Sequence, residues 1–129
     1  MNVTGTWKLV RTAAEAEDGT PITPPFGGEQ VIGRLVLSKD GRMMGAIMDA
    51  RTQIPAGETR QRSFYSGLYT FDGKQLRTRV DTSIDTDRVG GEQVRDVSFE
   101  GEFMVLRPPL RQYHGRMEKH ALWWVKIDD

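Results

Sequence analysis

Six side chains of this sequence could take part in acid–base chemistry: Asp81, Asp96, Glu118 and His120, with Tyr65 and Tyr69 as hydrogen-bond donors. Inside a cavity closed to water, such groups acquire shifted pKa values and could catalyse an isomerisation or a cyclisation. Their spacing shows no nucleophile paired with a base. Because acidic side chains are mostly solvated, a surface position for each of them stays open as the alternative.

Arg95 is the strongest candidate for holding a charged ligand. In residues 93–99 it alternates with Val97 and Phe99, so the three side chains share one face of a predicted strand. If that face points inward, the guanidinium could bind a ligand carboxylate or phenolate, or pair with an internal acid. A shift of one residue in register would instead place Arg95 on the surface.

The two histidines, His114 and His120, decide whether a haem group is expected. A haem-binding barrel needs a histidine directed into its cavity. His120 shares a face with Arg116, Glu118 and Lys126, which we interpret as the solvent side, and His114 precedes the strand. No ligand spacing matches a metal site, and cysteine is absent. We therefore expect neither a metal nor a cofactor.

Several strands mix polar and aromatic residues on the same face as apolar ones, which favours a partly polar cavity over a barrel packed solid. Methionines at positions 44 and 48 would add a surface that adapts to irregular apolar ligands, although methionine also fills ordinary cores. The side chains that we predict to contact a ligand are Arg95, Tyr65, Tyr69, Met44, Met48, Asp81 and Phe26.

These residues must be positioned by strands, because the sequence shows hairpin signals and no convincing amphipathic helix. Acidic-Gly pairs at Asp40-Gly41, Asp72-Gly73 and Glu100-Gly101 stand between alternating runs, and glycine supplies the positive φ of a tight turn. The predicted hairpins pair 30–39 with 42–51, 62–71 with 74–82, and 92–99 with 102–108. Residues 12–29, with Pro24-Pro25 and Phe26 ahead of two glycines, are predicted to form a long loop over one mouth.

The two ends of the chain predict that the sheet closes. Gly5-Thr6-Trp7-Lys8-Leu9-Val10 alternates as a half-buried strand, and a second aromatic strand, about 115–127, ends the chain. If these strands pair, about eight antiparallel strands form a barrel wide enough for side chains or one small ligand. We expect Lys126 to cover Trp7 and close the floor.

The order and spacing of these motifs resemble the lipocalin-like domain family of small bacterial proteins. The resemblance rests on Gly5-Thr6-Trp7, Gly33-Arg34-Leu35, the segment 89–95 before Glu100-Gly101, and Trp124-Val125-Lys126. It implies an all-β fold with a single antiparallel up-and-down β-barrel over residues 1–129. It also favours a fixed role for Arg95, structural or functional.

Composition limits the partners. With 18 Lys and Arg against 18 Asp and Glu, the net charge is zero, so we expect no nucleic acid and no anionic membrane as partner. The absence of cysteine, of a signal segment and of a long apolar run fits a cytoplasmic protein. An edge left by imperfect closure would invite a homodimer.

Three functions follow, in order of preference. The first is non-catalytic binding of a small, mostly apolar molecule inside the barrel, entered near the 12–29 loop. The second is an isomerase, cyclase or hydrolase acting on a small hydrophobic metabolite, with Arg95, Asp81 and Tyr65 as its first candidate residues. The third is a barrel packed shut that acts through its surface. Enzymatic activity is therefore left open, with binding preferred.

Overall fold

The computed structural model describes residues 2–113 and 115–128, and within them the protein is all-β with two short 3-10 turns. The strands are β1 (Gly5–Ala16), β2 (Pro21–Ile22), β3 (Val31–Leu37), β4 (Arg42–Asp49), β5 (Arg62–Phe71), β6 (Gln75–Ser83), β7 (Glu92–Glu100), β8 (Phe103–Arg107), β9 (Arg111–Tyr113) and β10 (Arg116–Asp128). The 3-10 turns are η1 (Gly28–Gln30) and η2 (Thr86–Arg88). No helix in these described ranges is long and apolar enough to cross a membrane.

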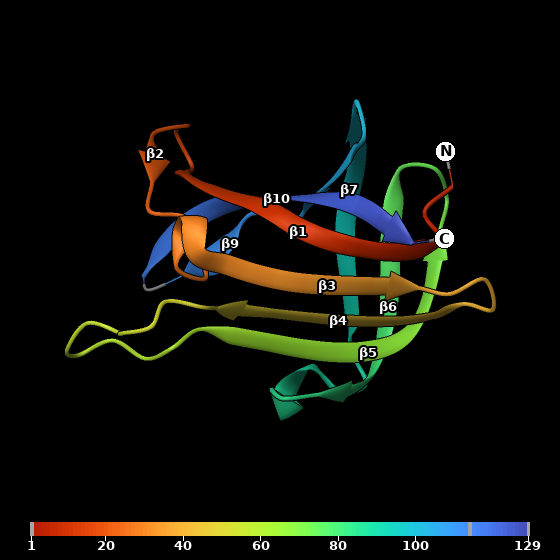
Figure 1. Ribbon diagram of the computed structural model, residues 1–129, viewed down its shortest axis with the longest axis horizontal. Helices are drawn as coiled ribbons and strands as arrows, with labels where there is room; N and C mark the ends of the chain where they lie inside the picture. The colour runs from red at the N-terminus through yellow and green to blue at the C-terminus, as the bar shows by residue number, and fades with distance from the viewer. Residues whose placement is uncertain (1, 114, 129) are drawn as a thin grey trace.

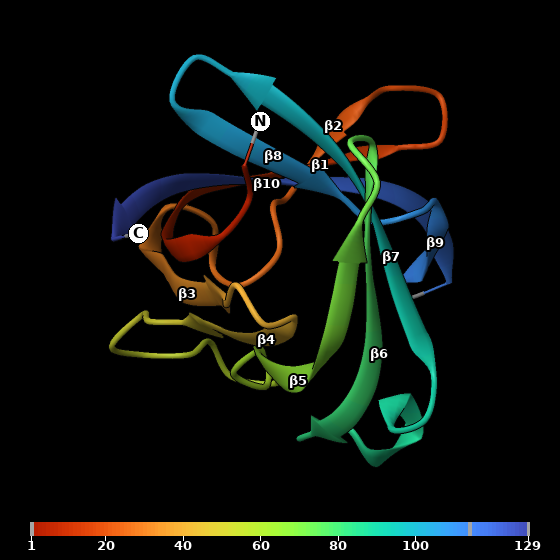
Figure 2. The ribbon, with the colours of Figure 1, turned by 90° about the vertical axis from the view of Figure 1, so that its right-hand side faces the viewer.

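Eight of the strands form a closed antiparallel barrel. Each pairs with its neighbour in the order β1-β3-β4-β5-β6-β7-β8-β10, and β10 pairs back with β1 to close the ring. Figure 2 shows this ring, and Figure 1 shows it from the side, with both termini at one end. The short strands β2 and β9 extend the sheet from β1 and β10. The predicted up-and-down barrel is confirmed.

The acidic-Gly turns fall where the sequence placed them. Asp40-Gly41 connects β3 to β4, Asp72-Gly73 connects β5 to β6, and Glu100-Gly101 connects β7 to β8. In all three turns glycine has a positive φ, which a side chain disfavours. The three predicted hairpins are therefore confirmed, with ends that differ by a few residues.

The first strand is longer than predicted. We expected residues 12–29 to form one long loop, whereas β1 continues to Ala16 along β10, with Ala16 opposite Glu118. The connection to β3 is correspondingly shorter and includes β2, which pairs with the end of β1. Long-range pairing with β10 therefore extends β1 where the local sequence shows no strand signal.

The barrel is closed at the end where the termini lie. Trp7 is buried there and donates from Nε1 to the Val3 carbonyl at 2.9 Å. The Lys126 Nζ lies over the Trp7 ring, 5.2 Å from the ring centroid. The expected cover of Trp7 by Lys126 is confirmed. Strand ends and connecting segments at the opposite end, among them η1 and the 50–61 segment, surround the mouth of the barrel (Figure 1).

Candidate functional site

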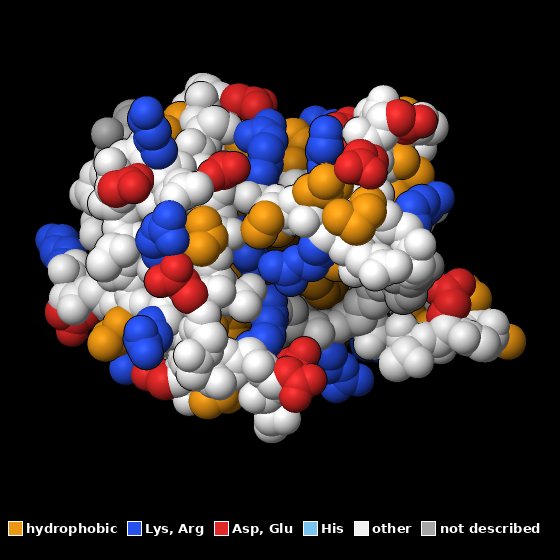
Figure 3. All heavy atoms as spheres, turned by 180° about the vertical axis from the view of Figure 1, so that it is seen from behind, with side chains coloured by type: hydrophobic (Ala, Val, Ile, Leu, Met, Phe, Trp, Pro, Cys, Tyr) orange, Lys and Arg blue, Asp and Glu red, His pale blue; other side chains and the backbone are white. Residues whose placement is uncertain are grey.

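The barrel holds a cavity of about 1060 Å³ that opens between the segments 23–28 and 57–63 and the residues Pro108, Arg111, Tyr113 and Arg116. Known small-molecule sites range over about 300–1,000 Å³, so this space accommodates a drug-sized molecule. A barrel packed shut, the third of the functions considered, is therefore wrong. Figure 3 shows the molecule from behind, where Lys or Arg side chains cross a hollow that has hydrophobic side chains behind them.

The deep part of the cavity is apolar. It is lined by buried residues that alternate inward along the strands, namely Leu35, Met43, Leu76, Leu106, Leu122 and Trp124. In β4 the residues that point into the cavity are Met43, Gly45 and Ile47. Gly45 has no side chain and so leaves space there. An apolar part of a ligand would be desolvated against this surface, which stabilises binding by about 25 cal/mol for each Å² buried.

Two arginines from different elements converge on one neutral oxygen in the cavity wall. Arg95 of β7 donates from Nη2 to Gln93 Oε1 at 2.9 Å, and Arg88 of η2 donates to the same oxygen at 3.2 Å. Arg88 also donates to Ser63 Oγ at 3.0 Å and lies 4.6 Å above the Tyr65 ring. Hydrogen bonds and a ring face, with no carboxylate among them, therefore hold the two guanidinium groups.

The arginines of this wall form no ion pair with a carboxylate in the described part of the chain. Neither Arg88, Arg95 nor Arg111 forms an ion pair with any described residue, although all three line the cavity. Burial lowers the pKa of Arg95; Tyr65 opposes this effect, and the charges of Arg111 and Arg88 add to it. A charge withdrawn from water needs a partner, so this wall is suited to an anion.

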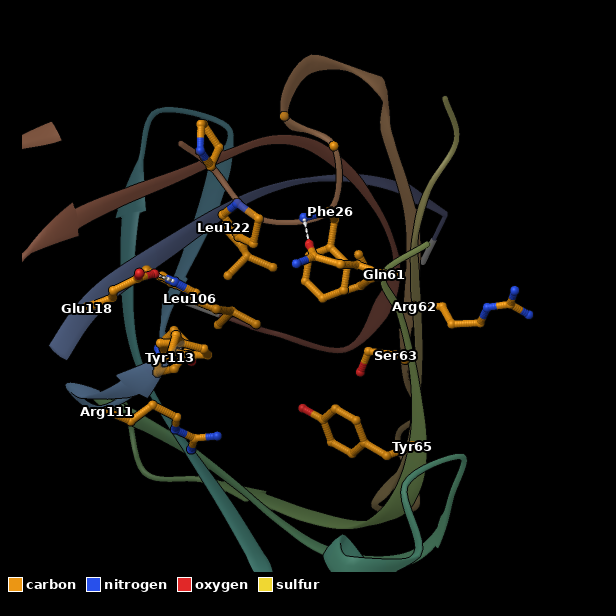
Figure 4. A pocket seen from close by; sticks show the side chains of 18 of the residues that line it. Phe26, Gln61, Arg62, Ser63, Tyr65, Leu106, Arg111, Tyr113, Glu118 and Leu122 are labelled. Carbon is orange, nitrogen blue, oxygen red and sulfur yellow. Dashed lines mark hydrogen bonds and ion pairs between the residues drawn. The ribbon is translucent and has the colours of Figure 1, made fainter. Parts of the chain in front are cut away.

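A second polar group lies on the wall formed by β9 and β10. Glu118 Oε1 and His120 Nε2 are 2.9 Å apart, and the side chains are only 10 % and 9 % exposed. The His120 ring stacks on Tyr113, with centroids 4.1 Å apart. The hydrogen bond with His120, followed by that from Arg116, holds the pKa of Glu118 below its usual value. Figure 4 shows Glu118, Tyr113 and Arg111 across the cavity from Tyr65.

The segment before η1 covers part of the mouth. Phe26 adopts a left-handed backbone (φ 60°), lines the cavity, and donates its backbone N–H to Gln61 Oε1 of the facing segment (Figure 4). Its neighbour Gly27 packs on Asp49, where an added Cβ would lie 2.2 Å from Oδ1. Asp49 is fully buried and pairs with Arg51 at 2.7 Å, and this hydrogen bond lowers the pKa of Asp49. The ion pair of the buried Asp49 with Arg51 thus lies under the segment 23–28 that covers the mouth.

Three of the seven predicted ligand contacts line the cavity: Phe26, Tyr65 and Arg95. Tyr69 is partly buried against the core, and its hydroxyl donates to the Ser38 carbonyl at 2.7 Å. Burial, helped by the negative charge of Asp40, raises the pKa of Tyr69. Tyr69 therefore braces the β3–β4 turn outside the lining of the cavity.

The other three predicted contacts lie on the outside of the barrel, so the predicted facing was wrong. Met44 and Met48 are 46 % and 37 % exposed, because the alternate residues of β4 occupy the interior. Both faces of β4 are apolar, which leaves its direction undetermined in the sequence. Asp81 is half exposed and pairs with Arg42 at 2.7 Å, and this hydrogen bond lowers its pKa. Asp81 is therefore not placed to take part in chemistry in the cavity.

The facing predicted for the last strand was also wrong. Glu118, His120, Leu122 and Trp124 line the cavity, whereas Trp123 packs outside under Arg11, with 4.3 Å between its ring centroid and the guanidinium carbon. Which residues of β10 point inward is determined by its pairing with β1, whose register shifts between Leu9 and Arg11. His114, the other histidine considered for haem, lies outside the described residues.

Arg88 and Arg111 were missed because they lie in short elements that carry no periodic signal, η2 and β9. A hint was present in the position of Arg88 between an Asp-rich turn and Gly90-Gly91, which is typical of a fixed turn. Among the described residues, no three His, Asp or Glu side chains lie together as a metal site would require.

Comparison with known proteins agrees with this architecture. A family model described as a lipocalin-like domain matches residues 4–127, nearly the whole chain. Neither the search of curated proteins nor the search of solved structures found a significant match.

Proposed function

The chain belongs to the lipocalin-like domain family, and from this premise we propose that it binds a small, largely apolar molecule carrying an anionic group inside its barrel. The barrel supplies an interior of about 1060 Å³ with an apolar floor. The anionic group distinguishes the proposal from general lipid binding.

The observation that carries the proposal is the meeting of Arg88 and Arg95 on Gln93 Oε1. Two like charges that share one neutral acceptor repel each other, and a bound carboxylate, phenolate or sulfonate would relieve that repulsion. Guanidinium groups hold such oxygens through two parallel N–H donors. Hydrogen bonds to charged groups contribute about 1.5–3 kcal/mol, which corresponds to roughly 10- to 150-fold in Kd.

The mouth of the cavity supports entry at the end away from the termini. Phe26 covers this opening and is attached to the facing segment through Gln61. Its left-handed backbone is of the kind found at ligand clamps, where strain of about 1–3 kcal/mol is held by the surroundings. A ligand would pass between the segments 23–28 and 57–63, with its apolar part toward Trp124 and its anionic group toward the arginines.

Two fluorescent probes test the proposal. 1-Anilinonaphthalene-8-sulfonate and N-phenyl-1-naphthylamine share a ring system, and only the first carries a sulfonate. We expect both to bind, the sulfonate at least about tenfold more tightly. Arg95→Met should remove that preference, whereas the matched control Arg79→Met, exposed on the outer face of β6, should keep it. Equal affinities in the wild-type protein would contradict an anion site.

Native mass spectrometry of protein purified from its own host identifies the natural ligand. An excess mass that is present under native conditions and lost on denaturation is expected. The released compound should carry an acidic group, and Arg95→Met should lower its occupancy.

A further inference from the structure

The Glu118–His120 pair has the arrangement of an oriented general base. Along β10 the residues at alternate positions face the cavity, which brings Arg116, Glu118 and His120 to one wall. The imidazole is held on two sides, by the carboxylate at 2.9 Å and by the stacked Tyr113 ring. A binding site that needs only cationic and apolar groups has no use for this carboxylate, which weakens the attraction of the cavity for an anion.

The hydrogen bond defines which imidazole nitrogen can react. Because the pKa of Glu118 is lowered, its carboxylate is ionised at neutral pH and can only accept a hydrogen bond. In the neutral imidazole Nε2 therefore carries the proton and donates it to Glu118, which leaves the lone pair on Nδ1. Nδ1 makes no hydrogen bond to any residue in the described ranges. It can accept a proton from a molecule in the cavity.

One arginine of the charged wall, Arg111, lies on the strand that pairs with β10 beside this imidazole. Arg111 of β9 stands directly opposite Glu118 in the β9–β10 pairing, and its charge acts on Arg95. Arg111 therefore belongs both to the charged wall around Arg95 and to the strand pair that carries Glu118. A carbonyl or carboxylate held by the guanidinium groups would have an adjacent carbon within the same cavity as His120.

We propose that the cavity catalyses proton transfer at a carbon next to a carbonyl group in small, largely apolar carboxylates, with His120 as the general base. This inference rests on the proposed function, because the arginines must first hold the substrate. Nδ1 takes the proton, the C–H electron pair forms a carbon–carbon double bond, and the carbonyl electron pair moves to oxygen. The guanidinium charge stabilises the resulting enolate. The imidazolium then returns the proton to the oxygen, so keto and enol forms interconvert without any oxidant or reductant.

Phenylpyruvate is a suitable probe, because it combines an aromatic ring, a carboxylate and an acidic C–H bond next to a ketone. We expect the protein to accelerate conversion of its enol to its keto form, followed by ultraviolet absorbance. It should also accelerate exchange of the methylene protons with deuterated water, followed by nuclear magnetic resonance. His120→Gln should lower both rates about 100-fold or more, the usual contribution of a general base. The control Lys119→Gln, exposed on the outer face of β10, should leave them unchanged.

Glu118 acts as a positioning residue, and its substitution separates this role from a structural one. Glu118→Gln keeps the shape of the side chain and removes its charge, so we expect kcat to fall at least about tenfold without a rise in KM. A role limited to stability would move the unfolding midpoint and leave kcat per folded molecule unaltered. This variant also carries the test should His120→Gln fail to fold.

Wild-type rates no faster than buffer would overturn the catalytic inference, and so would full activity in folded His120→Gln. The sulfonate probe then shows which claim has failed. Tight sulfonate binding that depends on Arg95, without acceleration, would leave the binding function standing. Loss of both would refute the anion site as well.

Discussion

Replacing Arg95 by methionine should stabilise the ligand-free protein, although it removes a side chain with two hydrogen bonds. Arg95 donates to the Val94 carbonyl and to Gln93 Oε1, each at 2.9 Å. In most positions the loss of two such bonds would destabilise the fold. Here the guanidinium is partly buried, pairs with no acid in the described ranges, and lies near two further arginines.

The magnitude follows from four contributions. Withdrawing an ionised group from water costs several kcal/mol even after relaxation, and that cost disappears in the variant. Two hydrogen bonds from a charged donor, worth about 1.5–3 kcal/mol each, are lost. Methionine buries a stem of similar length, and Gln93 Oε1 keeps its bond from Arg88 at 3.2 Å. These terms nearly cancel, and relief of the repulsion from Arg88 and Arg111 leaves a net gain of about 1 kcal/mol.

Urea unfolding without ligand measures this effect, with tryptophan fluorescence as the signal. The free energy of unfolding of Arg95→Met should exceed that of the wild type by about 1 kcal/mol, or roughly 4 °C in Tm for a chain of this length. The control Arg79→Met should change it by less than about 0.5 kcal/mol, as exposed substitutions do. Destabilisation of Arg95→Met by more than 1 kcal/mol would show that Arg95 is a structural residue whose charge is compensated in the ligand-free protein.

Two further predictions concern the support of the cavity. The pKa of Asp49 is lower in the folded protein than in the unfolded chain, where it is about 3.9. The ionised carboxylate therefore stabilises the fold fully above the unfolded pKa, and this stabilisation is lost as the pH falls through the folded pKa. The urea midpoint of the wild type should therefore fall as the pH is lowered from 7 to 3. Arg51→Met removes the partner of the buried Asp49 carboxylate, so it should lower the free energy of unfolding by about 3 kcal/mol at pH 7 and make the midpoint depend less on pH. Trp7 and Trp124 are equally buried, but Trp124 Nε1 has no hydrogen-bond partner in the described part of the chain, whereas Trp7 Nε1 donates to Val3. Trp7→Phe should hence destabilise the protein by about 1 kcal/mol more than Trp124→Phe in chemical unfolding, and equal costs would contradict this assignment.

The sequence determines the fold more clearly than it determines the site. Each acidic-Gly turn is a local feature, since the backbone there needs a residue that tolerates positive φ, and the flanking runs already alternate. Barrel closure follows from the terminal strands that carry Trp7 and Trp124, which must bury large apolar surfaces. The extension of β1 to Ala16 has no local signal, because it depends on pairing with a strand about a hundred residues away.

The sequence predicts which side chains of a strand point into the barrel only where one side of that strand is clearly more polar than the other. Arg95 shares its face with Val97 and Phe99, both packed against the core, so its inward position followed from periodicity. The two sides of β4 are about equally apolar, and tertiary packing alone selects the side of Met43 over that of Met44. In the first half of β10 the polar residues Glu118 and His120 point inward, opposite to the usual pattern. Such local violations of patterning are expected where function sets the side chains.

Although the net charge is zero, basic and acidic side chains are distributed unequally between the cavity and the outer surface, which accounts for the inward polar residues of β10. Seven arginines line the cavity, against two glutamates, whereas acids such as Asp81 and Glu92 pair with arginines on the outside. A sequence with balanced charges can therefore have more basic than acidic side chains around its cavity, although Arg51 and Arg116 there pair with acids. The positive wall attracts the anion, and Glu118 is the acid retained within it beside a histidine. A carboxylate at that position lowers the affinity for an anion and orients an imidazole, so it is better accounted for by reaction than by binding.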